Sequence, residues 1–291
     1  MICAENTLIR TCDEYSRPSP ISISIDEKFH VQQQYNWDCG IACVAMILKA
    51  CGQTPAWDDL IHSVGTESVW TIDLAILLHN RSIKFLFITK LAGVEQNHGH
   101  FTFYKDHFDN DSVRVSNLFH QASACSMPIQ EASIGEEKLI KLAKSNHIAV
   151  ILLVNFKILD PQSPDQSSSC VASRESYQGH YIILCGFDDV REVFMYRDPA
   201  KPEGVFLVSK QRLHFARISH GTDEDLLVID LKSSREESTK IHHDQENEKN
   251  RRDEHVSTPR TQARHSLQII LFNNFIQEKI NTLKTFVTQK S

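Results

Sequence analysis

The sequence lacks the features that mark membrane-spanning and secreted proteins. It contains no uninterrupted run of about 18 apolar residues, the length that a helix needs to cross a bilayer. Its first twenty residues, MICAENTLIRTCDEYSRPSP, have no apolar core behind a basic start, so we expect no secretory signal. Eight cysteines without such a signal are typical of free thiols in a reducing compartment. We therefore predict a cytoplasmic protein with no transmembrane span, the nucleus being the alternative compartment.

Motifs for metals, nucleotides and nucleic acids are also missing. No Cys-x-x-Cys pair occurs, which argues against a zinc ribbon or a thioredoxin-type site, and there is no Walker loop or glycine-rich phosphate loop. The histidines between residues 98 and 107 match no zinc-ligand spacing, and a formal net charge of −6 argues against a general nucleic-acid binder. We predict no cofactor, no metal and no nucleic-acid partner. Three acidic pairs are interpreted as solvated residues at helix starts and turns: Asp58–Asp59, Asp188–Asp189 and Asp223–Asp225.

Composition divides the 291 residues into four segments. Residues 1–28 are polar and predict a flexible lead, whereas residues 29–232 hold most of the apolar runs and predict the folded domain. Residues 233–265 are charged and nearly free of large apolar side chains, so we expect a disordered linker. Residues 266–291 have apolar positions at helical spacing, which predicts an amphipathic helix that lies on its own domain, on a partner or on a membrane surface.

Helical patterns dominate the first half of the domain and strand patterns the second half. Strands that follow helices in this way predict an α+β fold with a mainly antiparallel sheet. Helices are expected over residues 40–51, 54–65, 71–80, 112–124 and, from a Ser133–Glu136 capping box, 133–146. Strands are expected over residues 82–89, 148–154, 180–188, 192–198, 204–209 and 225–231, with a long loop over residues 155–178.

One cysteine stands at the start of the apolar helix, in the stretch QQYNWDCGIACVAMILKACG. Unpaired backbone N–H groups and the positive end of the helix dipole would stabilise Cys39 as a thiolate, the nucleophilic form of a thiol. The glycine at position 40 would leave the approach to the sulfur open. A free cysteine is more often a structural residue in a core, and that is the role we expect for Cys43 and Cys51.

A nucleophile of this kind needs a base and an orienting group. His180 opens the predicted strand HYIILCGFD, and Asp198 ends the next one, so a hairpin would bring both to the same end of neighbouring strands. An oxyanion donor is also needed, and Gln33 lies six residues before Cys39 in a run of three glutamines that leaves Gln32 and Gln34 as alternatives. Together these residues predict a Cys-His-Asp site.

This set resembles the cysteine peptidases that cleave double-glycine leaders in bacteriocin exporters. The similarity lies in QQYNWDCGIACVAMI, HYIILCGFD and RDPA. It implies a papain-like fold, with helices near the N-terminus packed on the sheet. It also implies a Cys-His-Asp triad with an oxyanion glutamine, the roles falling on Cys39, His180, Asp198 and Gln33.

A longer part of the chain, about residues 30–232, resembles the eukaryotic guanylyl cyclase domain-containing proteins, including the plant soluble guanylyl cyclase-like proteins. The similarity lies in WDCGIACVAMILKACG, SVWTIDLAILL, GHYIILCGFDDVREVFMYRDPA and GTDEDLLVIDL. The family name implies conversion of GTP to cyclic GMP. In the well-known cyclases that reaction uses two metal ions held by carboxylates, and no such ligand set is assigned in this sequence.

Three functions follow as hypotheses. The predicted one is a cysteine-peptidase-like thiol hydrolase that acts through Cys39 on a peptide or acyl bond of an unidentified peptide or protein. The alternatives are a guanylyl cyclase that binds GTP and a non-enzymatic interaction protein on a peptidase scaffold. The presence of Gln33, Cys39, His180 and Asp198 in one chain favours an enzyme over a scaffold that has lost its site.

Overall fold

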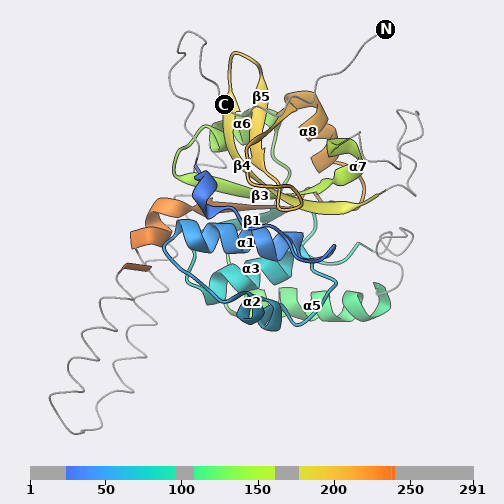
Figure 1. The fold of residues 1–291 in the computed structure, drawn as a ribbon. Helices are drawn as coiled ribbons and strands as arrows, with labels where there is room; N and C mark the ends of the chain where they lie inside the picture. The colour runs from blue at the N-terminus through green and yellow to red at the C-terminus, as the bar shows by residue number, and fades with distance from the viewer. Residues whose placement is uncertain (1–23, 96–107, 161–176, 237, 240–291) are drawn as a thin grey trace, which may run out of the picture.

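A computed structural model describes residues 24–95, 108–160, 177–236 and 238–239, and in it helices cover both faces of one sheet (Figure 1). Helices α1, α2, α3 and α5 lie on one face, and α6, α7 and α8 on the other. The helices are η1 (Glu27–Phe29), α1 (Cys39–Ala50), α2 (Trp57–Val64), α3 (Thr71–Asn80), α5 (Phe108–Ala124), α6 (Glu136–Ala143), α7 (Phe156–Leu159) and α8 (Lys210–Arg217). The strands are β1 (Phe85–Thr89), β2 (Ile129–Glu131), β3 (Ile148–Asn155), β4 (Gly179–Asp188), β5 (Val193–Arg197), β6 (Phe206–Ser209) and β7 (Leu226–Asp230).

Over the described residues, the sheet has seven strands in the order β2-β1-β7-β3-β4-β5-β6. Every neighbouring pair is antiparallel except β1 and β2, which run parallel. The predicted α+β fold, with helices from the N-terminal part packed on a mainly antiparallel sheet, is confirmed. In the described part of the chain no helix is long and apolar enough to pass through a bilayer.

Helix α1 packs directly on strand β4 of the sheet. All of its residues except Lys49 are buried, because it packs between the sheet and α3 and is apolar on nearly every side. It ends before Gly52, whose positive φ of 82° suits a residue without a Cβ atom. The sequence therefore predicts both the position and the burial of this helix correctly.

The opposite face is covered by short amphipathic helices. Leu139 and Leu142 of α6 and Leu213 of α8 pack on strands β3, β4 and β5. The sequence does not predict α8, because its residues KQRLHFAR are mostly polar and only one side of the helix is buried. Ser209 marks its start, since the hydroxyl accepts a hydrogen bond from the Arg212 N–H at 3.3 Å.

Two predicted helix starts are wrong. The Ser133–Glu136 capping box does not form: α6 begins after Gly135, and the Ser133 hydroxyl donates to the Glu224 carboxylate instead. Helix α2 begins at Trp57 and not near Thr54. The Ser133 partner lies far along the chain, so a local pattern could not reveal it.

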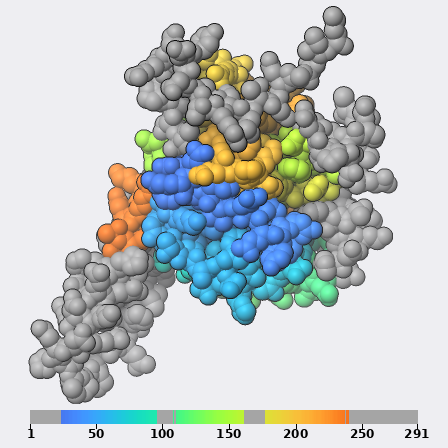
Figure 2. Space-filling view, in the orientation of Figure 1, coloured from blue at the N-terminus to red at the C-terminus, as the bar shows by residue number. Residues whose placement is uncertain are grey.

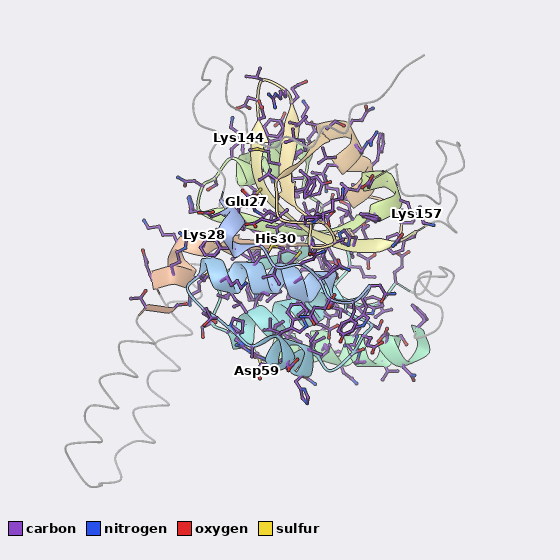
Figure 3. The ribbon with its side chains drawn as sticks, viewed as in Figure 1. Glu27, Lys28, His30, Asp59, Lys144 and Lys157 are labelled. Atoms are coloured by element: carbon purple, nitrogen blue, oxygen red, sulfur yellow. The ribbon has the colours of Figure 1, made fainter. Side chains whose placement is uncertain are left out.

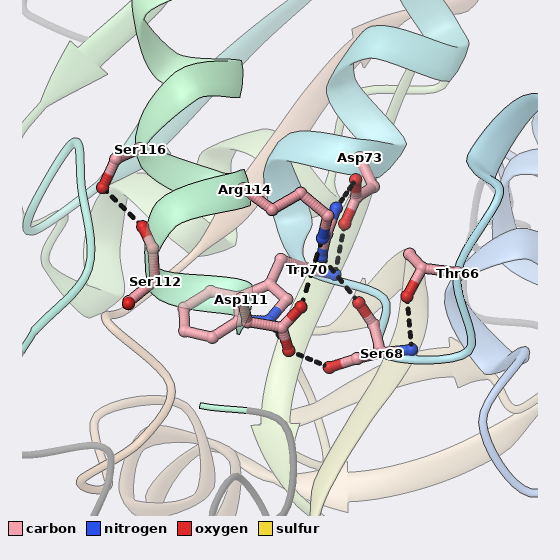
Figure 4. Close-up of polar contacts among 8 residues, drawn as sticks. All are labelled: Thr66, Ser68, Trp70, Asp73, Asp111, Ser112, Arg114 and Ser116. Carbon is pink, nitrogen blue, oxygen red and sulfur yellow. Dashed lines mark hydrogen bonds and ion pairs between the residues drawn. The ribbon is translucent and has the colours of Figure 1, made fainter. Parts of the chain in front are cut away.

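A partly buried ionic cluster ties α5 to the start of α3 (Figure 4). The Arg114 guanidinium contacts the Asp73 carboxylate at 2.6 Å and the Asp111 carboxylate at 3.1 Å, and it donates to the Ser68 carbonyl at 2.9 Å. Asp73 also accepts from the Trp70 backbone N–H, which satisfies one free donor at the start of α3. This cluster fixes the N-terminus of the helix that packs beside α1.

Packed residues extend past both predicted boundaries of the domain. Before residue 29, Ile25 is fully buried and its carbonyl accepts two hydrogen bonds from Arg197. After residue 232, the chain is helical to residue 236, Ser234 is buried, and Arg235 donates to the Ala50 carbonyl at 2.7 Å. The rest of the predicted lead and linker, and the helix predicted over residues 266–291, lie outside the described residues.

Candidate active site

The structure places Cys39 as the first residue of α1, with its side chain nearly buried. The sequence suggested that Gly40 leaves the approach to the sulfur open, but the structure does not bear this out. A Cβ atom there would come within 2.7 Å of a Leu74 methyl group and 2.9 Å of the Tyr181 ring. The glycine is needed because the start of α1 is pressed against α3 and β4, which fixes the position of the Cys39 backbone.

His180 lies at the start of β4 and joins the cysteine to an aspartate. Its Nε2 atom is 2.7 Å from the Asp198 carboxylate, and the Cys39 side chain lies close enough to the ring to raise its pKa. Because Nε2 is used by Asp198, Nδ1 is the nitrogen left for the sulfur. The Phe156 and imidazole rings pack edge to face at a centroid distance of 4.9 Å, which limits rotation of the imidazole.

The charges of the histidine and the aspartate stabilise each other. Burial by itself would lower the pKa of His180, but the hydrogen bonds to Asp198 and Cys39 outweigh it and raise the pKa to about 10. Burial would raise the pKa of Asp198, but the hydrogen bond and charge of His180 hold it below its usual value. The geometry therefore favours an imidazolium beside the Asp198 carboxylate.

Asp198 is the first residue after β5, and the chain around it keeps its carboxylate in place. Oδ1 accepts a hydrogen bond from the Ala200 N–H at 3.0 Å, and Oδ2 is 4.0 Å from the Lys201 ammonium. The contacts with Ala200 and Lys201 make Asp198 a fixed acceptor, as an orienting group has to be.

His30 is labelled in Figure 3. Burial lowers its pKa, and the charge of Arg197 lowers it further.

Gln33 is connected to the same place through the backbone. Its N–H donates to the Pro199 carbonyl at 2.9 Å, and its side-chain amide donates to the Tyr35 carbonyl at 2.7 Å. The buried Asp38 carboxylate closes the loop by accepting from the N–H groups of Gln34 and Tyr35, each at 3.1 Å. The Gln33 side-chain amide has two N–H groups, so one of them remains available to another acceptor.

The three neighbouring glutamines differ in their surroundings. Gln32 and Gln34 are exposed, whereas Gln33 is partly buried and bonded to the residue after Asp198. Figure 2 shows the blue segment that leads into α1 lying directly against the yellow-orange segment that follows β4. Of the three, Gln33 is the one held beside the Cys39–His180–Asp198 group.

A second polar group lies behind the first and was not predicted. The Tyr181 hydroxyl is 2.9 Å from the Thr71 hydroxyl, and Thr71 lies close enough to Asp225 to lower the pKa of that carboxyl. Asp225 was expected to be solvated, but it is nearly buried, and burial, with the nearby Asp223 charge, raises its pKa to about 8. In the sequence, the only indication that Asp225 would be buried was its position just before a buried strand.

No group of three histidine, cysteine, aspartate or glutamate side chains within the described ranges could hold a metal ion. The histidines at positions 98, 100 and 107 lie outside those ranges.

Comparison with known proteins gives the family. The family model described as guanylylate cyclase matches residues 29–229. The relative named guanylyl cyclase 1, from Arabidopsis thaliana, is 38% identical over 212 residues, which cover 72% of this chain and 77% of that protein. The chain belongs to this guanylylate cyclase family. The family predicted from the sequence is thus confirmed.

One solved structure was also matched. It is described as a putative C39-like peptidase from Bacillus anthracis, and it aligns with 72% of this guanylylate cyclase family member and 98% of its own chain. The TM-score is 0.43 and the sequence identity is 14%.

Proposed function

We propose that this guanylylate cyclase family member is a thiol hydrolase that uses Cys39 as its nucleophile on a peptide or acyl bond. The observation that supports it is the imidazole of His180, which is 2.7 Å from the Asp198 carboxylate and lies close enough to Cys39 for that side chain to raise its pKa. A nucleophile, a base and an orienting group in that order are the parts that covalent thiol catalysis needs. The free, reduced cysteines of the described residues support a reducing compartment, the cytoplasm or the nucleus.

In the proposed reaction the Cys39 thiolate attacks the carbonyl carbon of the substrate. The negative charge that develops on the carbonyl oxygen is stabilised by the backbone N–H of Cys39, which has no partner within the helix, and by the remaining Gln33 amide N–H. The His180 imidazolium then gives its proton to the leaving group, and the carbon–sulfur bond of an acyl-enzyme remains. Neutral His180 takes a proton from water, which attacks the acyl-enzyme and releases the acid and the thiolate.

A cyclase that converts GTP to cyclic GMP is the second candidate. It is favoured by the name of the Arabidopsis relative, guanylyl cyclase 1, and by the description of the family. It requires no role for Cys39. That difference makes the two candidates separable by one substitution.

Alkylation of the thiols tests the proposal. At neutral pH iodoacetamide should react with Cys39 faster than with Cys43 and Cys51, because burial raises the pKa of both other thiols, that of Cys51 to about 12. His180→Ala should slow the labelling of Cys39 at least tenfold, whereas Gln33→Ala should change it little, because an oxyanion donor acts after the attack.

Mass-spectrometric mapping of the alkylated sites gives the rates, and cyclic GMP formation is measured on the same samples. Slow labelling of Cys39, unchanged by His180→Ala, would reject a thiol hydrolase and favour the interaction protein. Cyclic GMP formation that persists in Cys39→Ala would favour the cyclase.

A further inference from the structure

Two aromatic rings stand at the surface immediately before the candidate nucleophile. Tyr35 and Trp37 are stacked, with ring centroids 5.7 Å apart and planes inclined by 5°. Tyr35 is 55% exposed, while Trp37 is half-buried against the core around α1. The Trp37 side chain thus anchors the pair to the core, and the Tyr35 ring is its solvent-exposed member.

The loop that carries these rings is held rigidly relative to Cys39. The Asp38 carboxylate accepts from the Tyr35 N–H, and the Tyr35 carbonyl accepts from the Gln33 amide at 2.7 Å. Cys39 itself begins α1, only two residues after Trp37. A ligand that covers the rings therefore meets a surface that needs little ordering, which favours binding.

The charge of the segment indicates what such a ligand would be. Residues 31–37 (VQQQYNW) contain no charged side chain, and the carboxylate of the next residue, Asp38, is buried and used by backbone N–H groups. A nucleotide would place phosphates that need cationic or N–H donors near the stacked base. An apolar side chain of a peptide needs only the exposed rings.

We propose that Tyr35 and Trp37 form an aromatic platform that binds a bulky apolar side chain of a peptide substrate next to the bond attacked by Cys39. This inference depends on the proposed thiol hydrolase, because it takes the reactive group of Cys39 as its reference point. It adds a substrate class: peptides with a large apolar residue beside the scissile bond. Tyr35 determines specificity here and takes no part in bond breaking.

Two peptidyl chloromethyl ketones, alike except for leucine or glycine next to the ketone, provide the test. The Cys39 sulfur displaces chloride from the methylene carbon, so a carbon–sulfur bond forms, the carbon–chlorine bond breaks and chloride leaves. The wild-type chain should react about tenfold faster with the leucine probe, which corresponds to about 1.4 kcal/mol. Tyr35→Ala should lose most of this preference, and Tyr35→Phe should keep it.

Phe215→Ala is the matched control, because Phe215 is an aromatic residue with a similar exposure of 52% on α8, on the other face of the sheet. It should leave the ratio of the two rates unchanged. The rate with iodoacetamide, which has no side chain to bind, should be the same in Tyr35→Ala and wild type.

The outcomes separate the two proposals. If iodoacetamide does not select Cys39, the thiol hydrolase fails, and the platform fails with it. If iodoacetamide selects Cys39 but the leucine-to-glycine ratio is the same in wild type and Tyr35→Ala, only the platform is wrong. If both probes react equally and GMP slows labelling in wild type but not in Tyr35→Ala, the rings bind a purine base and the peptide assignment is overturned.

Discussion

The ion pair between His180 and Asp198 determines how stability should depend on pH. The pKa of His180 is raised from 6.5 to about 10, so its contribution is complete below pH 6.5 and is lost as the pH rises toward 10. The pKa of Asp198 is lowered, so its contribution is present above the usual carboxyl range and lost in acid. The pair should therefore stabilise the fold most between about pH 5 and 6.5.

Asp198→Ala should accordingly lower the free energy of unfolding by about 3–5 kcal/mol at pH 6, because it leaves a buried imidazole without its partner. The loss should be smaller at pH 9, where the wild-type contribution is already declining. Urea unfolding at both values of pH measures it. Asp160→Ala, which removes a partly exposed contact to Lys201, should cost no more than about 1 kcal/mol at either pH. An equal loss for the two variants would contradict a stabilising His180–Asp198 pair.

Asp225 leads to a prediction of a substitution that stabilises the fold. Burial, with the charge of Asp223, raises its pKa from 3.8 to about 8, so ionising it in the fold is unfavourable. The wild-type chain therefore loses free energy of unfolding progressively as the pH rises from 3.8 to about 8. Asp225→Asn keeps the shape of the neutral acid, so its gain in melting temperature should grow from pH 4.5 to pH 8 and then stay constant. A gain that is the same at pH 4.5 and pH 8.5 would contradict a buried ionisable carboxyl.

At the scale of elements, the start of α1 is packed too closely against α3 and β4 to accept a Cβ atom at position 40. Gly40→Ala should lower the free energy of unfolding by about 1–3 kcal/mol, because the new methyl group overlaps Leu74 and Tyr181. It should also slow the labelling of Cys39, since α1 has to shift. Gly135→Ala, where a Cβ atom meets nothing within 4 Å, is the control and should cost less than about 1 kcal/mol. Chemical denaturation and iodoacetamide rates on both variants check this.

Elements with a strong local pattern were predictable and the others were not. Helix α1 and strands β3, β4 and β5 are marked by apolar runs, and the hairpin of β4 and β5 follows from their short separation. The start of α6 depends on Ser133 bonding Glu224, and α8 has only a narrow buried side, so neither left a local signal. Tertiary contacts, which a single sequence does not display, decided these cases.

For the whole molecule, the candidate site is assembled from three distant parts of the chain. Residue types and strand ends were enough to predict that Cys39, His180 and Asp198 would meet. The link from Gln33 to Pro199 and the network of Tyr181, Thr71 and Asp225 could not be predicted, because they depend on the register of strands with loops between them. The role of the assembled group as a catalytic site stays a prediction.

The C-terminal edge of the domain provides a last prediction, at the scale of the whole chain. A chain that ends after Thr239 keeps the Ser234 hydroxyl bonded to the Lys84 N–H at 2.9 Å and the Arg235 contact to Ala50. A chain that ends after Ser233 loses both. At about 1 kcal/mol for each hydrogen bond, the shorter chain should melt about 4–8 °C lower than the full chain.

The chain that ends after Thr239 should melt within about 2 °C of the full one, since each 1 kcal/mol shifts the melting temperature of a domain this size by about 2–4 °C. This expectation combines two premises: residues 240–264 have few large apolar side chains to add to a core, and the helix predicted over residues 266–291 lies on a partner or a membrane surface and not on this domain. Thermal unfolding of the three chains at equal concentration is the measurement. A large drop for the chain that ends after Thr239 would mean that residues 240–291 pack on the domain and that its boundary lies further along the sequence.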